Sequence, residues 1–147
     1  MTDVTAKRFD DMESALGGTF IRARAELGVG SFGMQVIDLP PGFDEPWSAH
    51  AHEGMPDELA FANHGQEEVY VPLSGRGTLI AGDERWELEP GMAVRVGPAQ
   101  TRQVVTTDEP LRYLALGGVP GRAYEPTAFS ALGAGDIPPV LAARGEG

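Results

Sequence analysis

The chain has 147 residues, with 22 acidic and 11 basic side chains and no cysteine. This length allows one well-buried core and is too short for two ordinary domains, while a net charge of −11 without a lysine or arginine run argues against nucleic acid and anionic membrane surfaces as partners. The lack of cysteine excludes disulfides, thiolate nucleophiles and sulfur-ligated metals, so any metal site must be built from nitrogen and oxygen ligands.

The first residues carry charges where a secretory signal needs an apolar run, and no stretch approaches the ~20 apolar residues of a membrane-spanning helix. We therefore expect a cytoplasmic protein. Asp10 to Leu16 predicts about two helical turns, which begin at an aspartate cap and end at Gly17-Gly18. This segment belongs to a short helical arm over residues 1–18.

From residue 19 onward, glycines and prolines separate short runs rich in Val, Leu, Ile, Thr and Tyr, which is typical of antiparallel β-structure. We expect strands at Thr19–Leu27, Phe32–Leu39, Trp47–His52, Glu68–Leu73, Gly77–Ala81, Arg85–Leu88, Met92–Val96, Gln103–Thr106 and Leu111–Leu116. Many short strands joined by tight turns indicate a sandwich or a barrel, because closure of the sheet removes exposed edges.

Two stretches depart from this pattern. Gly54 to Gly65 is a long loop where a hairpin turn is expected, and its apolar residues are candidates to cover a pocket mouth. Gly121 to Gly147 is rich in Ala, Gly and Pro and is expected to extend beyond the β-domain. The predicted organisation is therefore an arm at 1–18, a β-domain at 19–120 and a C-terminal extension at 121–147.

All three histidines of the chain lie between positions 50 and 64. His50 and His52 fall on one predicted strand, where alternate side chains share a face, so their rings form a chelating pair. A nearby carboxylate completes the two-imidazole, one-oxygen set that zinc, manganese, iron or nickel accepts. Glu67 and Glu68 are the nearby carboxylates, and because they are adjacent on a predicted strand only one of them can share a face with the histidines. The pattern raises the hypothesis of a divalent metal site.

The stretch from Pro41 to Gly121 resembles the cupins, which are small double-stranded β-barrels of the jelly-roll type. Their first motif reads G-x5-H-x-H-x3–4-E-x6-G. His50-Ala51-His52 supplies its histidines, and Glu68-Val-Tyr-Val-Pro-Leu-Ser-Gly75 fits its second half. Two spacings differ, because Gly42 lies two residues too far upstream and the inserted loop separates His52 from Glu68.

The second cupin motif, G-x5-P-x-G-x2-H-x3-N, begins at Gly91 in this chain. Its histidine is replaced by Arg102 and its asparagine by Thr106, so the third histidine ligand of the family is missing. The resemblance implies an all-β fold, a single jelly-roll (cupin) barrel with the N-terminal arm and the C-terminal extension outside it. It also implies dioxygenase or isomerase chemistry as candidate activities, and homodimers are common in the family.

Three arrangements of the site remain open. Arg102 pairs with Glu68 and the barrel holds no metal, since a buried carboxylate needs a cation. Alternatively, metal sits on His50, His52 and Glu68 while Arg102 binds an anionic oxygen of the ligand. In the third arrangement His64 returns from the loop to replace the lost histidine, although a loop histidine is usually only a loop histidine.

Trp47 and Tyr70 lie close to these residues in sequence and are candidates for the pocket wall with Arg102, although aromatic residues inside a β-barrel usually just fill volume. Trp86 is expected in the core. The charges at Arg22, Arg24 and Arg95 are expected on the solvated outer face.

The resulting hypothesis is a cupin that binds a divalent metal and a small anionic molecule, with a dioxygenase or isomerase activity. The alternative is a metal-free cupin that binds or senses a small molecule without catalysis, as the loss of the second-motif histidine favours. A purely structural or storage role has less support, because it requires no inward carboxylate beside two histidines.

Overall fold

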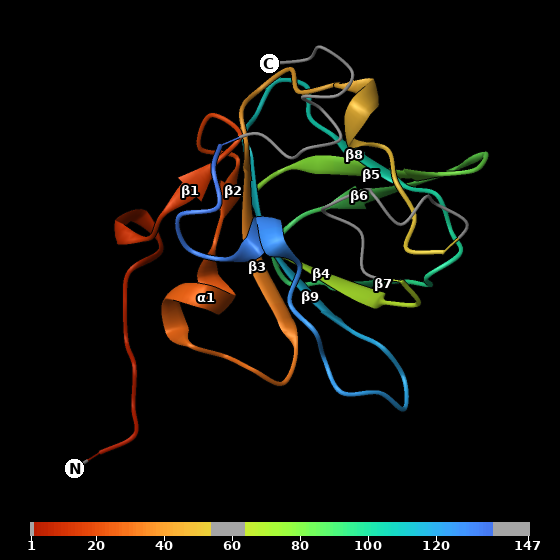
Figure 1. Ribbon diagram of the computed structural model, residues 1–147. Helices are drawn as coiled ribbons and strands as arrows, with labels where there is room; N and C mark the ends of the chain where they lie inside the picture. The colour runs from red at the N-terminus through yellow and green to blue at the C-terminus, as the bar shows by residue number, and fades with distance from the viewer. Residues whose placement is uncertain (1, 54–63, 137–147) are drawn as a thin grey trace.

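Two antiparallel β-sheets face each other in the computed structural model, which describes residues 2–53 and 64–136 (Figure 1). The larger sheet has the order β1-β2-β3-β9-β4-β7 and the smaller one β6-β5-β8. The strands are β1 (Ser14–Ala15), β2 (Phe20–Ile21), β3 (Gly33–Leu39), β4 (Glu67–Gly75), β5 (Gly77–Ala81), β6 (Glu84–Leu88), β7 (Val94–Val96), β8 (Gln103–Val105) and β9 (Leu111–Gly118). The all-β fold expected from the sequence is confirmed.

Helical structure among these residues is limited to short pieces: η1 (Phe9–Asp11), α1 (Ala23–Leu27), η2 (Pro46–Ser48) and η3 (Ala128–Ser130). None of the helices within 2–53 and 64–136 is long and apolar enough to span a bilayer. The lid proposed for the inserted loop falls largely on residues 54–63, which lie outside the described part of the chain.

The expected two-turn helix over Asp10 to Leu16 is wrong. Only η1 forms, and the backbone then enters the hairpin of β1 and β2, where Ala15 pairs with Phe20. The hairpin turns at Leu16, which adopts φ 55°, and at the two glycines that follow it. Because these residues take left-handed conformations, they bring the strands together instead of ending a helix.

The expected strand Thr19–Leu27 is correct only at its start. β2 ends at Ile21, and the next residues form α1, since Ala, Arg, Glu and Leu are strong helix formers. Gly28 ends this helix in the left-handed conformation, with φ 76°, and its N–H bonds to the carbonyls of Arg24 and Ala25. The local helix propensity therefore prevails over the alternation that predicted a strand.

The expected strand Trp47–His52 is also largely replaced. Pro46 begins the single turn η2, and the chain then pairs at one point only, where His50 and Arg102 exchange backbone hydrogen bonds of 3.0 and 2.9 Å. That bridge joins the histidine segment to the chain just before β8. It is enough to bring both residues to the same end of the molecule.

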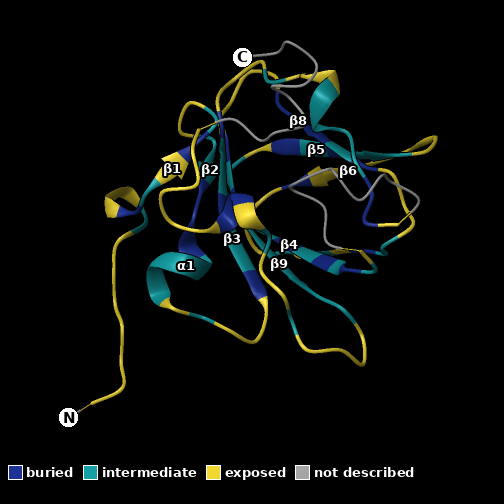
Figure 2. Cartoon of the chain, viewed as in Figure 1, coloured by how far each residue is buried: buried dark blue, intermediate teal, exposed yellow. Residues whose placement is uncertain are grey.

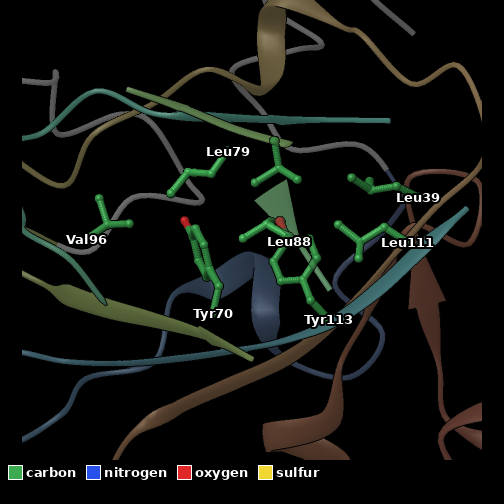
Figure 3. Close-up of a cluster of buried hydrophobic side chains, with 8 residues drawn as sticks. Leu39, Tyr70, Leu79, Leu88, Val96, Leu111 and Tyr113 are labelled. Carbon is green, nitrogen blue, oxygen red and sulfur yellow. The ribbon is translucent and has the colours of Figure 1, made fainter. Parts of the chain in front are cut away.

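The main core fills the space between the sheets, where Figure 3 shows Tyr70, Tyr113, Leu88 and Leu111 pointing toward one another. Its buried members are Leu39, Tyr70, Leu79, Leu88, Val96, Val104, Leu111 and Tyr113. Along β4, buried residues alternate with less buried ones, so Glu68 and Tyr70 face the interior as the period of two predicts. Figure 2 shows buried positions within strands such as β3, β4 and β5, and exposed positions mainly in the connecting segments.

Two expectations about burial were wrong. Trp86 lies on β6 at the edge of the smaller sheet and is 39% exposed, so it does not belong to the core. Arg22 is 2% exposed, and its guanidinium donates to the carbonyls of Phe129 and Gly135 and to Glu13. By contrast, Arg95 lies on the outer surface and pairs there with Glu67.

Candidate metal centre and its cavity

The two histidines of the H-x-H pair lie in the irregular segment between η2 and β4. Backbone hydrogen bonds hold this segment at three points: His50 exchanges bonds with Arg102, the His52 N–H donates to Pro98, and the His52 carbonyl accepts from Gly65. Both imidazoles therefore reach the interior side of β4, where Glu68 is located. Their rings lie 5.2 Å apart, nearly perpendicular to each other.

His50, His52 and Glu68 each place one potential ligand atom within 4.8 Å of the others. The Nε2 atom of His52 lies 3.0 Å from Glu68 Oε1, and that of His50 lies 3.7 Å from the same oxygen. Donors that bind one zinc ion at about 2.1 Å stand roughly 3.0–3.4 Å apart, so the two His–Glu separations are close to this spacing, while the widest pair, within 4.8 Å, must contract further. The group has the spacing of a metal centre.

The orientation of the His50 ring also fits a ligand. Its Nδ1 lies 2.9 Å from the carbonyl oxygen of Ser48, which can only accept, so this nitrogen carries the proton. In the neutral ring that a metal ion binds, the lone pair is then on Nε2, the nitrogen nearer Glu68. A backbone carbonyl that fixes the tautomer in this way is a common feature of metal-bound histidines.

One oxygen of the buried Glu68 carboxylate receives most of its hydrogen bonds. Tyr70 donates to Oε1 at 2.8 Å and Arg102 Nη2 at 2.9 Å, while His52 lies at 3.0 Å. Burial opposes the charged form of this side chain, but the neighbouring imidazoles of His50 and His52 outweigh that effect and hold the pKa of Glu68 well below its usual value. Glu68 is therefore an anion at neutral pH.

Arg102 is almost completely buried beside that anion. Its Nη2 binds Glu68, its Nε donates to the Tyr70 hydroxyl at 3.2 Å, and its Nη1 donates to the Gln100 carbonyl at 2.8 Å. The ion pair of the first sequence-based arrangement is thus present. The three-residue group of the second is present as well, because both share Glu68.

Tyr70 completes this network as a hydrogen-bond donor. Burial, reinforced by the charge of Glu68, raises the pKa of Tyr70 well above its usual value. The phenol stays protonated, donates to Glu68 and accepts from Arg102. It fixes the orientation of the carboxylate.

His64 does not belong to the group. Its side chain is exposed, and among the described residues the potential ligand set consists of His50, His52 and Glu68. Trp47 lies nearby with its ring edge-on to Phe43, and like Tyr70 and Arg102 it lines the adjoining cavity.

Gln66 is a polar residue of the site that the sequence did not single out. It is 6% exposed, and its amide reaches Glu68 Oε2 at 3.4 Å. It shares the parity of Glu68 and Tyr70, so the period of two that placed those residues inward could have found it.

A cavity of about 170 Å³ opens beside the group. Within it, Glu68 and Arg102 are the formally charged residues among the described ones, and the remainder of the wall is largely apolar or aromatic. The cavity therefore combines one charged end with a mostly apolar wall.

Comparisons with known proteins place this geometry in a family. The cupin domain model matches residues 35–117, more than half of the chain. A cupin protein from Bacteroides fragilis has 22% identity and a TM-score of 0.62, over 86% of this chain and 93% of that one. A sugar phosphate isomerase from a cupin superfamily of Silicibacter pomeroyi has 19% identity and a TM-score of 0.56, over 77% and 74%.

A protein from Thermus thermophilus also matches, with 19% identity and a TM-score of 0.51 over 79% of this chain and 90% of that one. No curated protein matches the chain. At such identities the solved structures establish the fold alone, and that fold is the one expected from the two motifs. With its family match and its two facing antiparallel sheets, the chain belongs to the cupins.

Proposed function

We propose that this cupin holds a divalent metal ion on His50, His52 and Glu68 and acts there on a small anionic molecule. The observation that carries the proposal is the convergence of three ligand atoms within 4.8 Å of one another beside a cavity. The tautomer of His50, fixed by Ser48, supports it further. Two nitrogens and one carboxylate oxygen leave open positions on the common divalent ions.

A divalent ion held by these residues would supply Lewis acidity for an isomerisation, or, if it were iron, would bind and activate dioxygen for an oxidation. The chain's own residues supply the setting. Tyr70 and Arg102 hold the Glu68 carboxylate in one orientation through hydrogen bonds of 2.8 and 2.9 Å. Glu68 carries one negative charge, whereas Arg102 and a divalent ion together carry three positive ones, so the loaded centre favours an anion.

A metal-free binding module is the second candidate, and a specific observation favours it. Glu68 already accepts hydrogen bonds from Tyr70 and Arg102 at one oxygen, so its charge is compensated without an ion. In that case the cavity binds a small molecule without metal chemistry, and the two histidines serve as hydrogen-bonding partners of the carboxylate.

Elemental analysis of the protein purified without added metal separates the two candidates. The metal-dependent function predicts close to one equivalent of a transition metal or zinc, and loss of this metal in the His50→Ala/His52→Ala variant. His64→Ala is the matched control, because it removes an exposed imidazole outside the group. Metal-free wild-type protein that also fails to take up one equivalent of Co²⁺ or Zn²⁺ would leave the binding module as the function.

A further inference from the structure

We propose that the substrate class of this centre is a small carboxylate with an apolar tail of a few carbons. The carboxylate binds at the His50-His52-Glu68 group, and the tail lies across β9 and β3 toward an aromatic wall. This inference rests on the proposed metal site and adds the chemistry of the molecule that the site takes.

Strand register shows which positions lie on the interior face of the sheet across from Glu68. Glu68 on β4 pairs with Gly117 on β9, and Gly117 pairs with Gly33 on β3. Residues directly opposite each other share a face of the sheet, so both glycines lie on the interior face with Glu68. Neighbouring strands are about 4.8 Å apart, which places Gly33 about 10 Å from the carboxylate-bearing position.

Residues with small side chains leave room above part of the interior face of the sheet, which forms the floor of the cavity. In the next inward-facing row, Tyr70 pairs with Ala115, which also lines the cavity. The space above the glycines is used by larger side chains: a Cβ at Gly117 would come within 2.5 Å of Gln66, and one at Gly33 within 3.0 Å of the Tyr124 hydroxyl. Ala115 therefore marks the open part of the floor, between the metal group and β3.

The far wall is aromatic and held in place. The rings of Phe20 and Phe129 lie 5.0 Å apart, and both line the cavity with Leu16. The buried Arg22 donates to the Phe129 carbonyl and lies 4.9 Å above its ring. This anchors η3 against β2, so the wall is preformed rather than assembled by a ligand.

Charge is confined to one end of this space. Glu68 and Arg102 are the charged residues among the described ones that line the cavity, and both belong to the centre. The side chains of Leu16, Phe20 and Phe129 offer no hydrogen bonds to the hydroxyl groups of a sugar phosphate, and the polar groups that also line the cavity, such as Thr19, Thr127 and Ser130, are uncharged. An apolar tail gains from burial at the same place. The volume of about 170 Å³ is similar to the ~150 Å³ that admits a benzene-sized molecule, which limits the tail to a few carbons.

The test is a chain-length series on protein loaded with one equivalent of Co²⁺, after the cobalt content has been measured. Acetate, butanoate, hexanoate and octanoate are titrated calorimetrically, with ribose 5-phosphate as the hydroxylated comparison. Affinity is expected to rise about fourfold per added methylene from acetate onward, the equivalent of burying each one, and to stop rising once the cavity is full. Ribose 5-phosphate is expected to bind more weakly than butanoate.

Ala115→Leu fills the open part of the floor. In this variant, butanoate and hexanoate are expected to lose their higher affinity relative to acetate, while acetate still binds. Ala123→Leu makes the same change at an exposed position that does not line the cavity and is expected to leave the affinities of the four carboxylates unchanged. If Ala115→Leu does not fold, the wild-type series decides alone.

If the protein binds cobalt but the affinity for carboxylates does not rise with chain length, this inference is overturned and the metal site stands. The same holds if ribose 5-phosphate binds more tightly than butanoate. Failure to bind cobalt overturns the metal site and this inference together.

Discussion

A metal ion at the proposed site would share the Oε1 oxygen of Glu68 with Arg102. The arginine occupies the position of a histidine ligand in the second cupin motif, and its Nη2 donates to Oε1, the oxygen nearest both imidazoles. A fixed positive charge beside this oxygen repels a second cation. The present arrangement should therefore bind metal more weakly than a site with a third imidazole.

Arg102→His should raise the affinity for Zn²⁺ or Co²⁺ by at least about tenfold, because it removes the competing cation and supplies another nitrogen ligand. Competition with a chelating indicator measures the dissociation constant. Arg95→His is the matched control, since Arg95 is exposed and pairs with Glu67 outside the site. Unchanged or weaker binding in Arg102→His would show that Arg102 does not oppose the metal.

At this scale, the period of two was sufficient to place Glu68 and Tyr70 inward, and the motif spacing identified Arg102. The burial of Arg22 could not be predicted in the same way. Its partners Phe129 and Gly135 lie more than a hundred positions away in the chain. No local pattern marks an arginine whose hydrogen bonds depend on a distant segment.

At the scale of elements, the tight connection between β4 and β5 depends on one glycine. Gly75 has φ 79°, and a Cβ at this position would lie 1.8 Å from the Pro110 carbonyl oxygen. Gly91 also has a positive φ, 98°, but a Cβ there meets nothing within 4 Å. A side chain at Gly91 therefore costs only the strained backbone conformation, whereas one at Gly75 costs that strain and a steric clash with Pro110.

Gly91→Ala should reduce the free energy of unfolding by about 1–2 kcal/mol, the cost of the left-handed conformation for an L-residue. Gly75→Ala should cost clearly more, about 3 kcal/mol or above, because β4 must also move away from the segment before β9. Urea denaturation of both variants provides the comparison. Equal losses would mean that the contact with Pro110 relaxes without cost.

The N-terminal arm is fastened to α1 by Glu26. This carboxylate accepts a hydrogen bond from Lys7 at 2.7 Å and from the Glu13 N–H at 2.8 Å. The Lys7 bond, followed by that of the Glu13 amide, lowers the pKa of Glu26 below its usual value. The unfolded chain then binds the proton more readily, so this contribution to stability is present above the unfolded pKa of about 4.3 and is lost as the pH falls through the folded value.

Glu26→Gln should therefore melt below the wild type at pH 7, and the difference should shrink at pH 3. Thermal unfolding followed by circular dichroism at both pH values tests this. A difference that is the same at both pH values would assign the effect to packing rather than to the charge of Glu26.

Strand prediction was most successful from β4 to β9, where turn residues alternate with short apolar runs. The expected strand Phe32–Leu39 is also correct, as β3 (Gly33–Leu39), and prediction failed before it for two physical reasons. Two-residue strands such as β1 are too short to show any period, and α1 is short enough that its helix formers resemble an alternating strand. The histidine segment was misassigned because a single bridge to Arg102, not a strand, positions it.

For the molecule as a whole, the two sheets close around a core while one end keeps polar groups around Glu68. Concentrating an anion, an arginine and two imidazoles inside an acidic protein is costly unless they compensate one another.

Homodimer formation, suggested by the cupin resemblance, stays a prediction that sedimentation velocity can test. The exposed run of residues 2–8 is available for such a contact.

Metal binding should appear as a change in global stability, because His50 and His52 reach Glu68 only in the folded chain. An ion that binds the folded state alone stabilises it by about 2.7 kcal/mol at a free concentration one hundred times its dissociation constant. For a domain of this size, that corresponds to a rise in Tm of about 5–10 °C. We expect this rise for chelator-treated protein to which Zn²⁺ is returned, measured by scanning calorimetry.

The same addition should leave the Tm of the His50→Ala/His52→Ala variant unchanged, whereas His64→Ala should respond as the wild type does. The rise should also grow with the logarithm of the zinc concentration, since the effect follows mass action. An equal rise in the double variant would locate the bound ion elsewhere on this acidic surface. The thermal shift therefore links the geometry of three side chains to the stability of the whole fold.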